Sequence, residues 1–116
     1  MKKKILFIYV VTALFFTGCT SYKLLYSWND YDNTSYKYLK NSDEKSTENL
    51  LKSYQQIITK QEGTRNTVPP GIYADYGFIL LQAGKTEEGK AMLKKEISLY
   101  PESKIFIDRI LKMFEQ

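Results

Sequence analysis

Apolar side chains recur at helical spacing along most of this chain, and that periodicity restricts its fold more than any other feature. Between Glu44 and Glu62 they fall on one stripe of a helix: Leu50, Leu51, Tyr54, Ile57 and Ile58. The same kind of spacing predicts three further helices, over 71–83, 86–99 and 103–116. The pattern therefore favours an all-α fold.

Glycine, proline and hydroxyl side chains divide this pattern into separate helices. Gly63 and Gly84 follow the last apolar turn of a helix, and Pro101 cannot continue the helix before it. Thr86 and Ser103 stand where a hydroxyl side chain can cap the first turn of the next helix. We therefore expect short connections between these helices.

An aromatic-rich segment over 28–40 precedes the periodic part of the chain. Its residues have strand as well as helix propensity, and we expect a short helix begun at Asn29 or Asp30. Trp28, Tyr31 and Tyr36 then either join the core, which we favour, or form an aromatic contact surface. With this segment the predicted domain has about five helices.

The first nineteen residues have the pattern of an export signal. Lys2, Lys3 and Lys4 precede a mostly apolar run over 5–16, which is shorter than the roughly 20 residues that span a bilayer. The run ends at Gly18-Cys19, which resembles the lipobox of bacterial lipoprotein signals. That resemblance implies cleavage between these two residues and lipidation of Cys19. An ordinary secretory signal and an uncleaved anchor are the alternatives.

Composition restricts what chemistry the mature chain can perform. The full chain has 17 basic and 13 acidic residues, and removal of residues 1–18 leaves 14 basic residues and almost no net charge. We therefore expect no nucleic-acid partner. The chain has no histidine and one cysteine, which excludes histidine-based catalysis and histidine metal sites. We expect no enzyme activity, no metal and no cofactor. Asp75 is either a ligand contact or an exposed polar residue.

The spacing of large and small residues from 73 to 101 resembles a tetratricopeptide repeat, whose period is about 34 residues. Gly77 and Gly89 match its two small positions, where two helices cross closely. Its other packing positions are matched by Tyr73, Tyr76, Leu80, Gly84, Leu93 and Pro101. Glu96 departs from the pattern, which has a small residue there. The resemblance implies a short stack of tetratricopeptide-like helical hairpins, and the alternative is an unrelated five-helix bundle.

In tetratricopeptide pairs the first helix lines the concave binding face. By that analogy the candidate partner-binding residues are Ala74, Phe78, Leu81 and Gln82. The alternative is that Phe78 and Leu81 pack against the preceding helix.

Three sequence clusters resemble a wider family: residues 26–31 (YSWNDY), 68–74 (VPPGIYA) and 100–103 (YPES). They are similar to a family of small bacterial envelope lipoproteins with a tetratricopeptide-like domain of unknown function. Its members are typically encoded beside a lipoprotein similar to the curli secretion channel. The resemblance implies an accessory protein of an outer-membrane lipoprotein complex or export system, with envelope lipoproteins as partners, a curli-channel-like protein among them. A binding lipoprotein for a glycan, peptide or lipid is the alternative.

These patterns together predict the organisation of the chain. We expect a signal peptide over 1–18, a lipidated tether over 19–27 and one helical tetratricopeptide-like domain over 28–116. Thr20 follows Cys19 where an aspartate would retain a lipoprotein in the inner membrane. The expected location is therefore the periplasmic face of the outer membrane, with the lipid as the membrane anchor.

Overall fold

The computed structural model describes residues 1–14, 18 and 21–115. The predicted lipidation site Cys19 lies outside the described residues, and so does one side of the predicted cleavage point. The described helices are α1 (Lys2–Leu14), α2 (Tyr31–Asn41), α3 (Glu44–Thr59), α4 (Ile72–Gln82), α5 (Thr86–Leu99) and α6 (Lys104–Phe114), with a 3₁₀ turn over Pro101–Ser103. Since the described residues contain no strand, the prediction of an all-α fold is confirmed.

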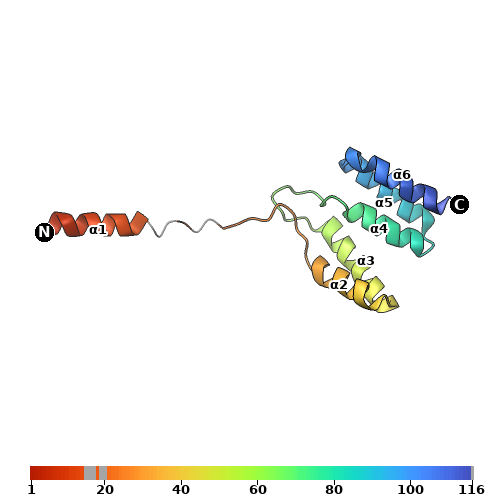
Figure 1. Ribbon diagram of the computed structural model, residues 1–116, viewed down its shortest axis with the longest axis horizontal. Helices are drawn as coiled ribbons and strands as arrows, with labels where there is room; N and C mark the ends of the chain where they lie inside the picture. Colours follow the sequence, from red (N-terminus) through yellow and green to blue (C-terminus); the bar gives the residue numbers. More distant parts are fainter. Residues whose placement is uncertain (15–17, 19–20, 116) are drawn as a thin grey trace.

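Helix α1 stands apart from the others in Figure 1, and within the described residues it packs on none of them. It covers most of the apolar run that follows the three N-terminal lysines. No helix in the described part of the chain is both long and apolar enough to span a bilayer.

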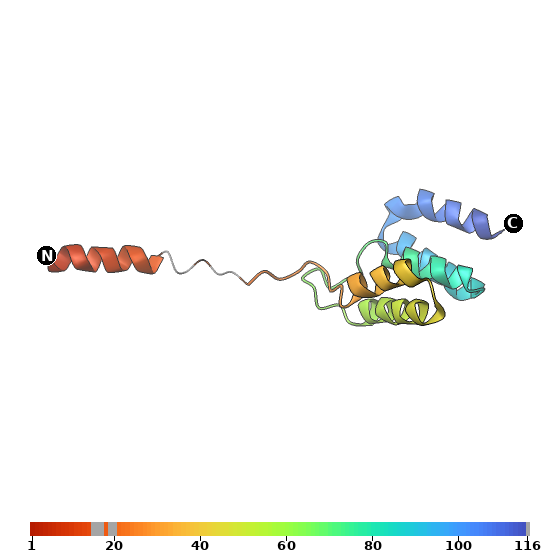
Figure 2. The ribbon, with the colours of Figure 1, turned by 60° about the horizontal axis from the view of Figure 1, so that its bottom comes forward.

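The remaining five helices form a stack built from two antiparallel pairs. Helices α2 and α3 form the first pair and α4 and α5 the second, while α6 packs on α4 and α5 at the end of the stack (Figures 1 and 2). The pairs meet where α3 contacts α4. Helix α4 therefore lies in the middle of the domain.

Two buried clusters hold this stack together, and α4 contributes to both. The first cluster joins α3 to α4 and consists of Leu50, Tyr54, Ile57, Val68, Ile72, Tyr73, Tyr76, Ile79 and Leu80. The second joins α4 to α5 and α6 and consists of Ala74, Leu81, Leu93, Ile107 and Ile110. Burial on two sides explains why α4 is apolar around most of its circumference.

Helices α4 and α5 approach most closely at Gly77 and Gly89. A Cβ atom on Gly77 would lie 2.8 Å from the Gly89 carbonyl oxygen, and one on Gly89 would lie 2.8 Å from the Gly77 carbonyl oxygen. The Cβ atom on Gly89 would also lie 2.7 Å from Cγ of Leu81. Both glycines are therefore required by the helix crossing.

Two of the predicted helix caps are wrong. Thr86 is the first residue of α5 and makes no side-chain cap, because Lys85 occupies the N-cap position. Ser103 does occupy the predicted N-cap position of α6, but its hydroxyl makes no cap hydrogen bond and donates instead to the Tyr100 carbonyl oxygen at 2.6 Å, because residues 101–103 form a 3₁₀ turn. Asp43 instead provides a capping box for α3, accepting a hydrogen bond from the Ser46 backbone N–H at 2.6 Å.

Gly63 does not end α3, which stops at Thr59. It lies against the chain that enters the domain, and a Cβ atom on it would be 2.4 Å from the Leu25 carbonyl oxygen. The backbone N–H groups of Thr64 and Arg65 donate to the Leu24 and Leu25 carbonyls, each at 3.0 Å. The contacts of the folded domain thus begin at Leu24, within the segment 19–27 that the sequence predicted as a tether.

Candidate functional site

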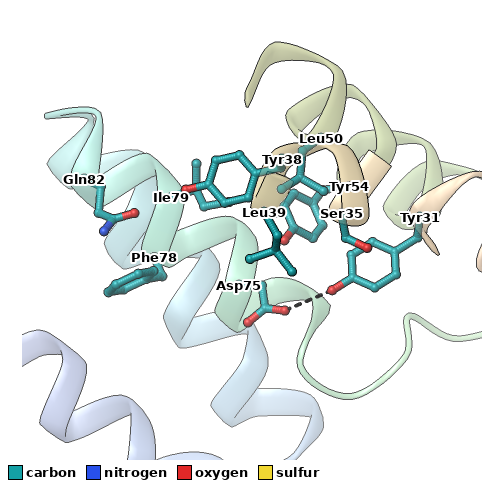
Figure 3. A pocket seen from close by; sticks show the side chains of 10 residues that line it. All are labelled: Tyr31, Ser35, Tyr38, Leu39, Leu50, Tyr54, Asp75, Phe78, Ile79 and Gln82. Carbon is teal, nitrogen blue, oxygen red and sulfur yellow. Dashed lines mark hydrogen bonds between the residues drawn. The ribbon is translucent and has the colours of Figure 1, made fainter. Parts of the chain in front are cut away.

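An open groove runs between α2 and α4, with α3 as its floor (Figure 3). It encloses about 300 Å³. Its lining residues are Tyr31, Ser35, Tyr38, Leu39, Leu50, Tyr54, Asp75, Phe78, Ile79 and Gln82. The groove forms because α2 and α4 each pack on α3 while, within the described residues, their backbones do not approach each other closely.

A row of aromatic rings that pack at tilted angles supports one side of the groove. The ring centroids of Trp28 and Tyr31 are 5.7 Å apart, and so are those of Tyr31 and Tyr54. The row continues to Tyr76, whose ring centroid is 5.6 Å from that of Tyr54. Such spacings stabilise aromatic pairs and hold the rings in fixed positions. Tyr36 takes no part in the row, because it points away from the core and is 63 % exposed. The expectation of a core role is therefore wrong for Tyr36, and it is also wrong for Trp28, which is 37 % exposed.

Asp75 is the acidic residue that lines the groove. Its carboxylate oxygen Oδ2 accepts a hydrogen bond from the Tyr31 hydroxyl at 3.3 Å (Figure 3). Desolvation beside the rings raises the pKa of the Asp75 carboxyl, and the hydrogen bond from Tyr31 partly opposes that rise. Burial and the nearby Asp75 charge in turn raise the pKa of the Tyr31 and Tyr54 hydroxyls.

No cationic side chain neutralises Asp75 within the described residues, where the salt bridges join Glu48 to Lys52 and Lys104 to Asp108. An unpaired carboxylate beside aromatic ring faces attracts cations, because both the charge and the ring quadrupoles favour them. The groove is therefore suited to an apolar ligand that carries a positive group or a hydrogen-bond donor.

The structure divides the four predicted partner-binding residues into two groups. Phe78 and Gln82 line the groove, as the analogy predicts. Ala74 and Leu81 are 4 % and 5 % exposed and face α5 and α6, so they cannot contact a partner. They are seven residues apart and share the stripe of α4 next to the groove, and Phe78 lies between the two surfaces because it also packs against this buried cluster.

The alternative packing of Phe78 and Leu81 on the preceding helix is also wrong. The Phe78 ring contacts Phe114 of α6 edge to face, with centroids 5.8 Å apart. Leu81 reaches Gly89 of α5. This face of α4 therefore packs on α5 and α6 and not on the preceding helix.

Sequence reasoning missed the wall of the groove that α2 contributes. Tyr31, Ser35, Tyr38 and Leu39 lie on one face of α2, at spacings of three, four and eight residues. This spacing was present in the aromatic segment and could have identified the face. It could not show that the face opposes Asp75, because that juxtaposition joins residues 44 positions apart.

The residues that matched the repeat positions are mostly buried. Tyr73, Tyr76, Leu80 and Leu93 are between 0 and 9 % exposed. Gly84 has a φ of +77° just after α4, a conformation that favours glycine, and exposed Pro101 begins the 3₁₀ turn. These positions form the packing framework and not the groove surface.

Glu96, which departs from the repeat pattern, has a structural partner. It is 2 % exposed, and its Oε1 atom accepts a hydrogen bond from the backbone N–H of Gly71 at 2.7 Å. Gly71 is the N-cap of α4, where a negative charge is favourable. Glu96 therefore fixes the start of α4 to α5.

The described residues contain no group of three or more acidic or cysteine side chains placed to hold a metal ion. A comparison with curated proteins and a comparison with solved structures each gave no match. Residues 25–110 match a family described as "Domain of unknown function (DUF4810)". Its first matched residue, Leu25, is also among the first residues whose backbone joins the folded domain. The match covers most of the chain, and the protein therefore belongs to the DUF4810 family.

Proposed function

We propose that the protein is a lipid-anchored accessory protein of the bacterial cell envelope that acts without catalysis as a protein-interaction scaffold. Its groove between α2 and α4 would bind a segment of another lipoprotein in an outer-membrane complex or export system. The observation that carries this proposal is the position of the groove, which lies between the first helices of two consecutive helix pairs. This is the concave side on which tetratricopeptide-like stacks bind their partners.

The packing of the helices supports a tetratricopeptide-like interpretation. Helices α2–α3 and α4–α5 are consecutive antiparallel pairs, and α6 packs on α4 as the first helix of a following pair would. The crossing of α4 and α5 at Gly77 and Gly89 supplies the close approach that the repeat requires. Stacked pairs of this kind expose one continuous surface for binding.

The lining of the groove suits the binding of a protein segment better than it suits catalysis. Its walls are mainly aromatic and aliphatic, and its ends are open. Tyr and Leu side chains give apolar contact area, and Asp75 can select a positive group on the partner. Leu39 is 77 % exposed at the rim, so the surface is accessible.

A matched pair of substitutions tests the groove. Leu39→Asp places a charge on the groove rim, whereas Leu99→Asp places one on a 44 % exposed leucine outside it. In affinity capture from detergent-solubilised envelopes, we expect Leu39→Asp to lose the lipoproteins that the wild type captures. Leu99→Asp should retain them. Equal capture by both variants, with unchanged circular dichroism, would overturn the assignment of the groove.

The lipid anchor has a separate test. Metabolic labelling with a tagged fatty acid should mark the wild type and should not mark Cys19→Ser. Fractionation of the membranes should place the labelled protein in the outer membrane. Labelling of both proteins would refute lipidation at Cys19.

A binding lipoprotein for a glycan, peptide or lipid is the second candidate function. The groove volume of about 300 Å³ favours it, since small-molecule sites begin at about that size. Soaking crystals with short peptides and oligosaccharides would distinguish the candidates. A small ligand held between Tyr31 and Gln82, with no lipoprotein captured, would favour the second.

A further inference from the structure

A second exposed apolar surface lies where the chain enters the domain. We call it the entry patch, and its residues line one open hollow: Tyr22, Lys23, Leu24, Leu25, Tyr26 and Trp28. Tyr22 is 94 % exposed, Leu24 66 %, Leu25 57 % and Trp28 37 %. Large apolar side chains gathered in this way usually mark a contact surface.

Hydrogen bonds hold the backbone of the entry patch in place. Besides the bonds from Thr64 and Arg65 to the carbonyls of Leu24 and Leu25, the Glu62 backbone N–H donates to the Ser27 hydroxyl at 2.7 Å. The side chain of Gln61 completes the attachment, because it donates to the Ser27 carbonyl and accepts from the Ser27 N–H. The two leucines are thus exposed by a fixed backbone and not by a free tail.

Contacts made by Gly63 and Tyr26 add to this attachment. Gly63 lacks a side chain where one would collide with the backbone of Leu25 and Tyr26. The Arg65 guanidinium lies over the Tyr26 ring, with its carbon 5.9 Å from the ring centroid. The backbone of the segment and the Tyr26 ring are therefore held against the domain, while more than half of each leucine side chain stays exposed.

The position of the entry patch identifies what would cover it. Tyr22 follows Cys19 by three residues, which extend over about 10 Å at most. Figure 1 shows the segment 22–28 at the end of the domain where the chain enters it. An acylated Cys19 would therefore hold these side chains at the surface of the bilayer.

The chemistry of the patch also matches a membrane surface. Tyr and Trp favour the interface between lipid headgroups and hydrocarbon, and leucine favours the hydrocarbon below it. Lys23 and Arg65 add two positive charges against the one of Glu62, which suits an anionic lipid surface. We propose that the entry patch inserts into the interface of the bilayer and docks the domain on it in a fixed orientation. This inference rests on the lipid anchor of the proposed function.

Trp28 provides a direct test, because it is the single tryptophan of the chain. The full acylated protein is reconstituted into vesicles of phosphatidylethanolamine and phosphatidylglycerol that carry a headgroup-proximal doxyl quencher. We expect strong quenching of Trp28, an emission shift to shorter wavelength and protection from aqueous acrylamide, relative to the protein in detergent. The double variant Leu24→Ser/Leu25→Ser should lose most of these effects.

A matched double variant, Leu99→Ser/Ile105→Ser, removes two exposed aliphatic side chains outside both the patch and the groove, and it should dock on the vesicles as the wild type does. If the protein floats with the vesicles while Trp28 stays unquenched and accessible to acrylamide, the docking inference is overturned and the anchor stands. If the wild type and Cys19→Ser both fail to float, the anchor fails and the docking inference fails with it.

Discussion

Replacing Gly89 by alanine has two opposing effects on the stability of the protein, both of which act at the crossing of α4 and α5. Alanine favours a helix over glycine by about 1 kcal/mol, so helix propensity alone predicts a more stable protein. The added Cβ atom, however, would lie 2.7 Å from Leu81 Cγ and 2.8 Å from the Gly77 carbonyl oxygen. The Gly77 carbonyl oxygen belongs to the backbone and cannot move without separating the helices.

We expect the steric cost of the added Cβ atom to exceed the gain in helix propensity. Overpacking of a tightly packed core costs about 1–3 kcal/mol. After subtraction of the propensity gain, we expect Gly89→Ala to lower the free energy of unfolding by about 1 kcal/mol. For a domain of roughly 100 residues this corresponds to a decrease in Tm of about 5 °C.

Urea denaturation of the full chain, followed by circular dichroism, measures this difference. Ala91→Gly on the exposed face of α5 is the control, because it reports the propensity difference in the same helix without a close contact. Gly77→Ala should also destabilise the protein. The double variant Gly77→Ala/Gly89→Ala should lose less free energy of unfolding than the two single variants lose together, because one separation of the helices relieves both contacts. If Gly89→Ala raises the free energy of unfolding by about as much as Ala91→Gly lowers it, the close approach of the two helices is refuted.

Substitutions at three further residues test other parts of the structure. Glu96→Ala should lower the free energy of unfolding by roughly 2 kcal/mol, because it leaves the Gly71 N–H without its acceptor, and Glu96→Gln should retain most of the stability in the same urea assay. Asp75→Asn should stabilise the protein at pH 7 but not below the ordinary pKa of 3.8, measured by thermal unfolding across pH. Because the pKa of the Asp75 carboxyl is raised in the folded state, this group stabilises the fold at low pH, and that stability is lost as the carboxyl ionises. Gly63→Ala should displace the backbone of Leu25, and limited proteolysis of the full chain should then cut residues 22–28 faster than in the wild type.

Much of this fold could be predicted because it depends on local pattern. Spacing of apolar residues located α3 to α6 within a few residues, and the two small residues of the α4–α5 pair lie at the crossing itself. The cap assignments failed because a hydroxyl near a helix start has several backbone partners within reach. Ser103 bonds to the preceding Tyr100 carbonyl, a choice that one sequence position does not reveal.

The groove was harder to predict because it depends on contacts between distant segments. The repeat analogy identified α4 as one wall, but α4 is oriented so that Ala74 and Leu81 pack on α5 and α6 instead of lining the groove. The opposite wall comes from α2, and its tyrosine meets Asp75 only after both helices have packed on α3. The attachment of Leu24 and Leu25 to Thr64 and Arg65 is likewise a pairing across 40 residues.

The entry patch and the groove are physically continuous, and this continuity narrows the kind of partner that the proposals allow. Trp28 belongs to the patch, and its ring packs at a tilt against that of Tyr31, which lines the groove. A domain docked through the patch would therefore hold the Tyr31 end of the groove near the bilayer and direct the Gln82 end away from it. A partner segment that fills the groove would have to approach within a few side chains of the membrane surface. Another lipid-anchored protein meets that requirement, since its own anchor confines it to the same surface and raises its effective concentration there.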